Sequence, residues 1–274
     1  MPQPLRWVLS ALVKRARKVY EQTLAPNQPT ILMAAHNLAV GLRVLGQYQL
    51  ARRLDEYTLT RRQRVLGDDH PDTLVSAHNL AADLAIFGDY ERARQLDEDT
   101  LLRRRRMLGD DHPDTLLSAH NLAADLRPLG HYQRAHELDE DTLLRRRRVL
   151  GNDHPDTLVS ASDLAADLAI LGEYQQACDL GEDTLLRRRR VLGDDHPDTL
   201  VTANNVAVEL RLLGHYQRAR QLDEETLTRR RRVLGDNHPD TLLSAHNLLA
   251  DLHALGEDEK ARDLNKWIEL RHSL

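Results

Sequence analysis

The chain has 274 residues, a formal net charge of −5, only 4% aromatic residues and a single cysteine, Cys178. This charge argues against a nucleic-acid binder that relies on bulk positive charge, and one cysteine excludes a disulfide framework within the chain. No apolar run approaches the roughly 20 residues that span a bilayer. Arginine supplies almost all of the basic charge. Together these features favour a cytoplasmic protein of bacterial origin.

The N-terminal segment has an apolar stretch, 5–13, followed by a basic cluster at 14–18. A secretory signal has its positive charge before the apolar stretch, so the order argues against a signal peptide. Residues 5–24 align in register with the second helix of the repeat described next. The alignment predicts that 1–26 form a half-repeat capping the N-terminal end of a stack.

A pentapeptide, His-Pro-Asp-Thr-Leu, recurs every 42 residues along the rest of the chain. Its histidines are His70, His112, His154, His196 and His238. A period of this length is typical of a solenoid, in which each repeat packs against its neighbours. The spacing therefore predicts that 27–274 form six 42-residue repeats.

Each repeat opens with a predicted helix, here called helix A. In the repeat that starts at the first pentapeptide, Pro71 suits the first turn, and Asp69 or His70 would be the N-cap. Apolar residues recur at helical spacing over 72–87. Gly88 ends the helix, because glycine adopts the left-handed conformation of a C-cap.

A second helix, helix B, is predicted over 89–108 and ends at Gly109. Three acidic residues, 97–99, precede four arginines, 103–106. This order favours i,i+4 ion pairs and places positive charge at the helix C-terminus. Two antiparallel helices and two short connections fill the 42 residues, which indicates an all-α fold.

The stretch NLAADLAIFGDYERA at 79–93 resembles a tetratricopeptide repeat. The resemblance rests on Leu80, Ala81, Gly88, Tyr90 and Ala93. The 42-residue length and the pentapeptide are similar to the kinesin light chain type of this repeat. The resemblance covers about 27–274. It implies a right-handed α-α superhelix whose A helices line the concave surface.

Two regions depart from the pattern. On the last B helix Trp267 replaces a repeat residue, and we expect it to cover the terminal apolar face. In the fourth repeat Gly181 lies inside helix B, where glycine is about 1 kcal/mol less favourable than alanine. We therefore expect local softness near 178–184.

One column of the A helices is asparagine: Asn37, Asn79, Asn121, Asn205 and Asn247. The resemblance implies that this asparagine hydrogen-bonds the backbone of an extended peptide. A carboxamide suits that role, since it offers a donor and an acceptor together. The alternative is that each asparagine bonds the neighbouring repeat.

Two further columns accompany the asparagines. One is His36, His78, His120 and His246, and the other is Asp83, Asp125, Asp167, Glu209 and Asp251. Together they predict a polar, net-acidic groove for a protein or peptide with basic residues. Alternatively, the acids pair with arginines on adjacent B helices. The i,i+5 spacing within a repeat suits joint metal ligation poorly, so we expect no metal and no cofactor.

The sequence favours a non-catalytic protein-interaction scaffold, because it lacks a P-loop, a nucleotide-binding glycine fingerprint and HExxH. One alternative is a self-assembling element or the sensor arm of a larger NTPase. Another is nucleic-acid binding through the arginine runs. Four consecutive helical residues spread around the helix, however, and cannot all face one phosphate backbone.

Overall fold

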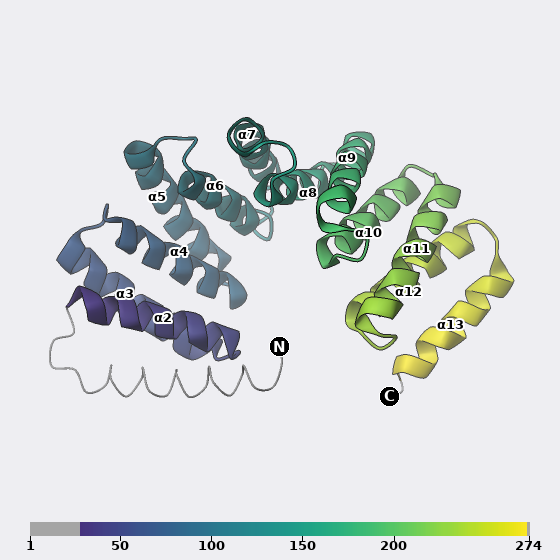
Figure 1. Ribbon diagram of the computed structural model, residues 1–274, viewed down its shortest axis with the longest axis horizontal. Helices are drawn as coiled ribbons and strands as arrows, with labels where there is room; N and C mark the ends of the chain where they lie inside the picture. Colours follow the sequence, from purple (N-terminus) through teal and green to yellow (C-terminus); the bar gives the residue numbers. More distant parts are fainter. Residues whose placement is uncertain (1–27, 273–274) are drawn as a thin grey trace. The chain divides into compact units, whose positions relative to one another are not determined.

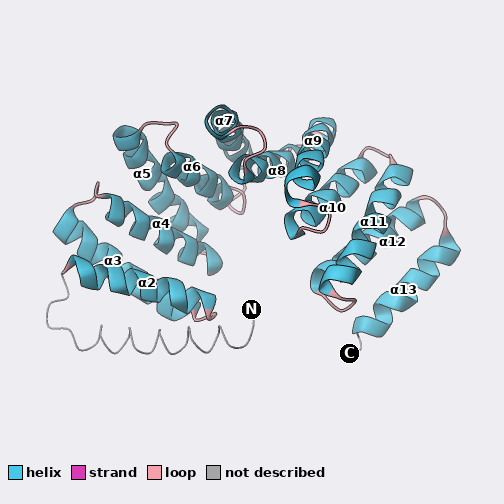
Figure 2. Cartoon of the chain, in the orientation of Figure 1, coloured by secondary structure: helices cyan, strands magenta, loops and turns pink. Residues whose placement is uncertain are grey.

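A computed structural model describes residues 28–272. The predicted half-repeat at 1–26 lies outside the described residues. The described part is entirely helical, with no strand (Figure 2). By its contacts the chain divides into two compact units, unit 1 at Met1–His131 and unit 2 at Tyr132–Leu274. None of the helices in this part combines the length and apolar content needed to cross a bilayer.

Helices of two kinds alternate along the chain. The A helices are α2 (Pro29–Val44), α4 (Pro71–Ile86), α6 (Pro113–Leu126), α8 (Pro155–Ile170), α10 (Pro197–Leu212) and α12 (Pro239–Ala254). The B helices are α3 (Tyr48–Leu66), α5 (Tyr90–Leu108), α7 (Tyr132–Leu150), α9 (Tyr174–Leu192), α11 (Tyr216–Leu234) and α13 (Asp258–His272). Within each unit every helix packs against the next along the chain (Figure 1).

The histidine of the pentapeptide is the N-cap of helix A. The backbone N–H of Asp72 donates to Nδ1 of His70 over 3.1 Å. The other four pentapeptides repeat this bond at 3.2 Å. Capping satisfies a backbone donor that the first helical turn leaves free. Of the two candidate caps in the sequence, the structure selects His70.

Glycines with positive φ end the helices. Gly88 has φ 76° after helix A, and Gly109 has φ 87° after helix B, a conformation that other residues rarely adopt. Helix α6 ends at Leu126, two residues short of the usual 16. Pro128 explains this, since proline has no backbone N–H to donate the next helical hydrogen bond, although Arg127 keeps helical backbone angles.

A buried arginine joins each B helix to the next A helix. In α5, Arg104 is 3% exposed. Its Nη1 donates to the carbonyl oxygen of Asp114 over 3.0 Å and to Oγ of Ser118 over 2.8 Å. Arg62, Arg146, Arg188 and Arg230 make equivalent bonds. One arginine of each run is thus part of the packing between repeats.

The two irregular regions are well packed. Gly181 is buried, and a Cβ there would lie 2.9 Å from both Glu209 Oε2 and Val206 Cγ2. The neighbouring A helix therefore fills the space that a side chain would need. In α13, Ile268 is buried, and Trp267 packs on the same apolar cluster. The role of α13 as a C-terminal cap stays a prediction.

Candidate partner-binding face

The outward side of each A helix carries exposed aliphatic residues around the asparagine position. On α2 these are Met33, Val40 and Val44, which are 56%, 41% and 50% exposed. They lie at i, i+7 and i+11 and share one helical face with Asn37. Further exposed members are Ile86 and Leu117 in unit 1, and Ile170, Val201, Leu212 and Leu243 in unit 2. We call this surface the A-helix face.

The asparagine column links neighbouring A helices. Nδ2 of Asn79 lies 3.1 Å from Nδ1 of His36, and Nδ2 of Asn121 lies 2.8 Å from Nδ1 of His78. In unit 2, Nδ2 of Asn247 donates to Oδ1 of Asn204 over 2.9 Å. For these three asparagines the structure therefore agrees with the alternative of a bond to the neighbouring repeat. Their carbonyl ends take no part in these bonds. Asn37 and Asn205 are exposed.

The histidine column takes part in the same interaction. His36 and His78 are half-buried, and the bonded Nδ1 atoms act as acceptors. Burial, together with Arg104 and Arg43, lowers the pKa of His78 to about 4, and burial also lowers the pKa of His36. Both rings are neutral near pH 7, as an acceptor nitrogen requires. His120 is half-buried, and His246 is exposed.

The acidic column does not line the A-helix face, so the prediction of an exposed, net-acidic groove is wrong. Its members are between 0% and 5% exposed: Asp83, Asp125, Asp167, Glu209 and Asp251. Asp83 lies at i+7 from Ser76 and i+3 from Leu80, which are both buried. Helical spacing therefore turns this carboxylate inward, onto the packed side of the helix.

The buried acids meet where three consecutive helices join: an A helix, its B helix and the next A helix. At the first joint, formed by α2, α3 and α4, Nε of Arg43 donates to Oδ1 of Asp83 over 2.6 Å. Arg43 also bonds Asp55 of α3. At the fifth joint, Nη1 of Arg211 in α10 donates to Asp251 over 2.9 Å. The pairing arginines thus come from the preceding A helix, rather than from adjacent B helices as the alternative supposed.

The second and fourth joints lack that arginine. Ala85 holds the position at the second joint, where Asp97 and Asp125 are 3% and 5% exposed. At the fourth joint Ala169 replaces the arginine and Gly181 replaces the acid of helix B, so Glu209 remains. Burial raises the pKa of Asp97 and Glu209 to about 8, and that of Asp125 to about 7.

Several other arginines of the runs bond acids of the same chain. Nε of Arg103 lies 2.7 Å from Asp99, and its Nη1 lies 2.7 Å from Asp69. Arg187 and Arg229 bond two acids each in the same way. Pairing of this kind neutralises the positive charge that a phosphate backbone would need. The arrangement favours a salt-bridged surface over a nucleic-acid interface.

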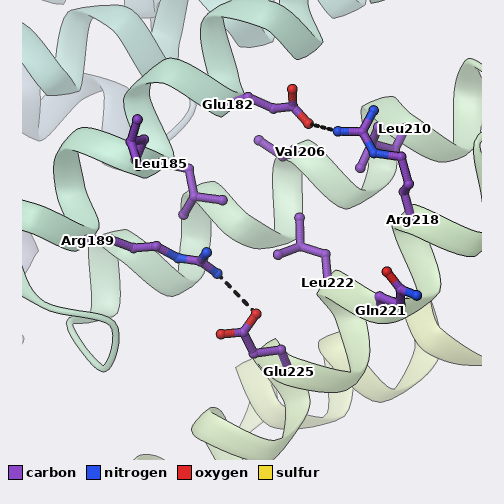
Figure 3. Close-up of a pocket in the computed structure, with 10 residues that line it drawn as sticks. Glu182, Leu185, Arg189, Val206, Leu210, Arg218, Gln221, Leu222 and Glu225 are labelled. Atoms are coloured by element: carbon purple, nitrogen blue, oxygen red, sulfur yellow. Dashed lines mark hydrogen bonds and ion pairs between the residues drawn. The ribbon is translucent and has the colours of Figure 1, made fainter.

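Unit 2 carries a second surface feature that the sequence did not reveal. A cavity of about 380 Å³ lies over α10, between α9 and α11 (Figure 3). Ion pairs from Glu182 to Arg218 and from Arg189 to Glu225 border it, at 2.5 and 3.1 Å. Val206 lies in its lining, at a position where the other five repeats have leucine. The smaller side chain of Val206 is the sign of this cavity that the sequence carries.

The single cysteine is buried. Cys178 is 2% exposed and packs with Val206, Leu210 and Ala219. Burial raises the pKa of its thiol to about 11, so the nucleophilic thiolate is scarce near pH 7. In the described part of the chain, no three His, Cys, Asp or Glu side chains converge as metal ligands would.

Two family models, both described as tetratricopeptide repeat, match the chain. One matches residues 30–101, 156–231 and 210–268, and the other matches 115–156. The chain belongs to the tetratricopeptide repeat family. Proteins of this family are generally non-catalytic scaffolds, and neither matching model describes a catalytic family. A search of curated proteins found no match.

Solved structures agree with this tetratricopeptide repeat assignment. A Podosopora anserina protein of the kinesin light chain type, with nearly identical TPR-like repeats, is 28% identical. That match covers 78% of this chain and 99% of that one, with a TM-score of 0.67. The repeats described above are therefore kinesin light chain-like, as the 42-residue period predicts.

More distant matches share the fold alone. A Pyrococcus horikoshii signal-transduction ATPase with a tetratricopeptide repeat sensor is 12% identical. It aligns over 99% of this chain and 40% of its own length, with a TM-score of 0.72. The quorum sensor NprR of Bacillus thuringiensis is 14% identical over 96% of this chain and 82% of its own, with a TM-score of 0.66.

Proposed function

We propose that this chain is a non-catalytic cytoplasmic scaffold whose A-helix face binds an extended peptide segment carrying aliphatic side chains. The exposed aliphatic residues on successive A helices carry the proposal. Exposed apolar surface of this kind marks interaction sites on soluble proteins. Helices α2, α4 and α6 are adjacent in unit 1, as the bonds from Asn79 to His36 and from Asn121 to His78 require. A peptide can therefore cross several repeats of one unit.

The asparagines complement the aliphatic residues. The inter-repeat bond occupies Nδ2 of Asn79, which leaves the carbonyl oxygen as the acceptor for a peptide N–H. Hydrogen bonds to the backbone of a peptide tolerate many peptide sequences, whereas contacts with the exposed aliphatic residues select peptides that have apolar side chains. The proposal differs from the expectation of an acidic groove, because the acids lie beneath this face.

A displayed library of random peptides, selected against the full chain, tests the proposal. We expect selected peptides to be rich in aliphatic residues and to lose binding when Ile86 and Leu117 are both changed to Asp. Leu102 and Leu186 are exposed leucines of B helices, 56% and 69% exposed, so their double change to Asp is the matched control. The proposal would be contradicted if the Leu102 and Leu186 variant lost as much peptide binding as the Ile86 and Leu117 variant. It would also be contradicted if the Ile86 and Leu117 variant lost no binding.

A sensor arm of a larger NTPase remains the second candidate. The observation that favours it is the alignment of 99% of this chain with part of an ATPase that has a tetratricopeptide repeat sensor. At 12% identity that likeness concerns the fold. The peptide-binding proposal applies equally to a sensor arm, since the arm would recognise its signal with the same face.

A further inference from the structure

The first and fifth joints demonstrate what a pair of buried acids holds in this fold. Arg43 bonds Asp55 and Asp83 at the first joint. Arg211 lies 2.9 Å from Asp251 and 3.8 Å from Asp223 at the fifth. Both arginine side chains are 19% exposed, while the acids are fully buried. A guanidinium therefore reaches these carboxylates from a position that solvent can reach.

The second joint has the acids without the arginine. Oδ1 of Asp97 and Oδ2 of Asp125 are buried, and neither has a hydrogen-bond partner in the described structure. Two basic side chains lie near. Nδ1 of His78 is 4.0 Å from Asp97 Oδ1, but this ring is neutral near pH 7. Arg104 directs its Nη1 to Asp114 and Ser118 of the next helix.

We propose that the second joint binds the guanidinium of an arginine supplied by the partner, in the position that Arg43 fills at the first joint. The inference rests on the proposed function and adds a specific side chain to the peptide. A guanidinium is the matching group, because its planar fork can donate to two carboxylates at once. Ala85 ends at Cβ where Arg43 extends its side chain, and the neighbouring Ile86 belongs to the A-helix face. A peptide crossing α4 therefore passes this position.

The fourth joint provides a natural control within the chain. It also has alanine, Ala169, in place of the arginine. Gly181 removes one acid, however, and the Glu209 carboxylate lies where a side chain at 181 would be. A guanidinium at the fourth joint would therefore meet one carboxylate instead of two, in a space that Glu209 already occupies. We expect arginine binding to be weaker there than at the second joint.

Protonation links this binding to pH. A guanidinium requires a carboxylate, whereas burial raises the pKa of Asp97 to about 8 and of Asp125 to about 7. The pair therefore holds protons at pH 6 and releases them as an arginine enters. Binding that releases protons strengthens as pH rises. The affinity for arginine should increase between pH 6 and 8.5.

The probe is N-acetyl-arginine methylamide, titrated into the full chain by NMR, with the lysine analogue as the matched probe. We expect the arginine probe to bind at least about tenfold more tightly than the lysine probe, as charge-assisted bonds to two acids imply. Ala85→Arg fills the site from within and should weaken the arginine probe at least about tenfold. Ala169→Arg should leave binding unchanged. Asp125→Asn, which removes one acceptor charge, should also weaken binding, and circular dichroism confirms folding of each variant.

Equal affinity for the two probes, or unchanged arginine binding in Ala85→Arg, would overturn the inference. The peptides selected on the A-helix face separate it from the proposed function. If they bind but tolerate arginine-to-citrulline replacement, the A-helix proposal survives and the arginine site fails. If the arginine probe binds the second joint while no peptide is selected, the site stands and the peptide proposal fails.

Discussion

The first and second joints of unit 1 bring the same three repeat positions together but treat their buried acids differently. At the first, Arg43 bonds both Asp55 and Asp83. At the second, Ala85 leaves Asp97 and Asp125 without that cation. The backbone plan is the same, so one side chain decides whether a guanidinium bonds the acid pair. Burial raises the pKa of an acid at both joints, of Asp55 to about 7 and of Asp97 to about 8. Nearly identical repeats can therefore differ in electrostatics while sharing a fold.

The difference alternates along the chain. Arginine holds this position at 43, 127 and 211, and alanine holds it at 85 and 169. The structural period is 42 residues, but the charge pattern has twice that period. Replacing the arginine of the first joint with alanine, or the alanine of the second joint with arginine, should therefore give each joint the stability of the other.

The largest loss of stability from a single substitution is expected from Arg43→Ala, which converts the first joint into the type of the second. Breaking a buried ion pair from one side costs about 3 kcal/mol or more, because the acids stay buried without their partner. We expect the free energy of unfolding to fall by about 3 kcal/mol at pH 8. Urea unfolding followed by circular dichroism measures this change.

The reciprocal variant is the control for that measurement. Ala85→Arg should raise the free energy of unfolding at pH 8, since it supplies the missing cation to Asp97 and Asp125. A loss of stability in Ala85→Arg of the same size as in Arg43→Ala would mean that the joints are not equivalent.

A pH dependence of comparable size follows from Asp97. Its pKa is about 8 in the fold, against the ordinary 3.8, so between these values the folded chain binds a proton that the unfolded chain releases. Stability from this group is therefore full below pH 4 and is lost as pH rises toward 8. Relative to Asp97→Asn, the wild type should lose roughly 4 kcal/mol of unfolding free energy between pH 5 and 8.5. Parallel pH profiles of the two proteins would refute this.

The smallest effect concerns the fourth joint, where the acid of helix B is absent. Alanine favours a helix over glycine by about 1 kcal/mol, but a Cβ at 181 would lie 2.9 Å from Glu209 and Val206. We expect Gly181→Ala to lower the free energy of unfolding by about 1 kcal/mol, as overpacking does. The shorter acid in Glu209→Asp should relieve that loss in the double variant. Simple additivity of the two changes would argue against the contact.

Much of the fold could be predicted from the sequence. Helix A was expected at 72–87 and lies at Pro71–Ile86, and helix B was expected at 89–108 and lies at Tyr90–Leu108. Proline, glycine and apolar periodicity act locally, so they are visible in one repeat. The exposure of the acidic column was predicted wrongly. A carboxylate is normally exposed, and Asp83 departs from that rule because Arg43, 40 residues away, bonds it.

The sequence by itself determined the period, the helices and their caps, because these depend on contacts within a few residues. Tertiary structure decided which polar side chains are buried and which partners they have. It showed Arg104 inside the packing, the asparagines bonded between repeats and the second joint without its arginine. Each of these depends on residues brought together from different helices, and near-identical repeats leave the identity of those partners open until the helices are packed.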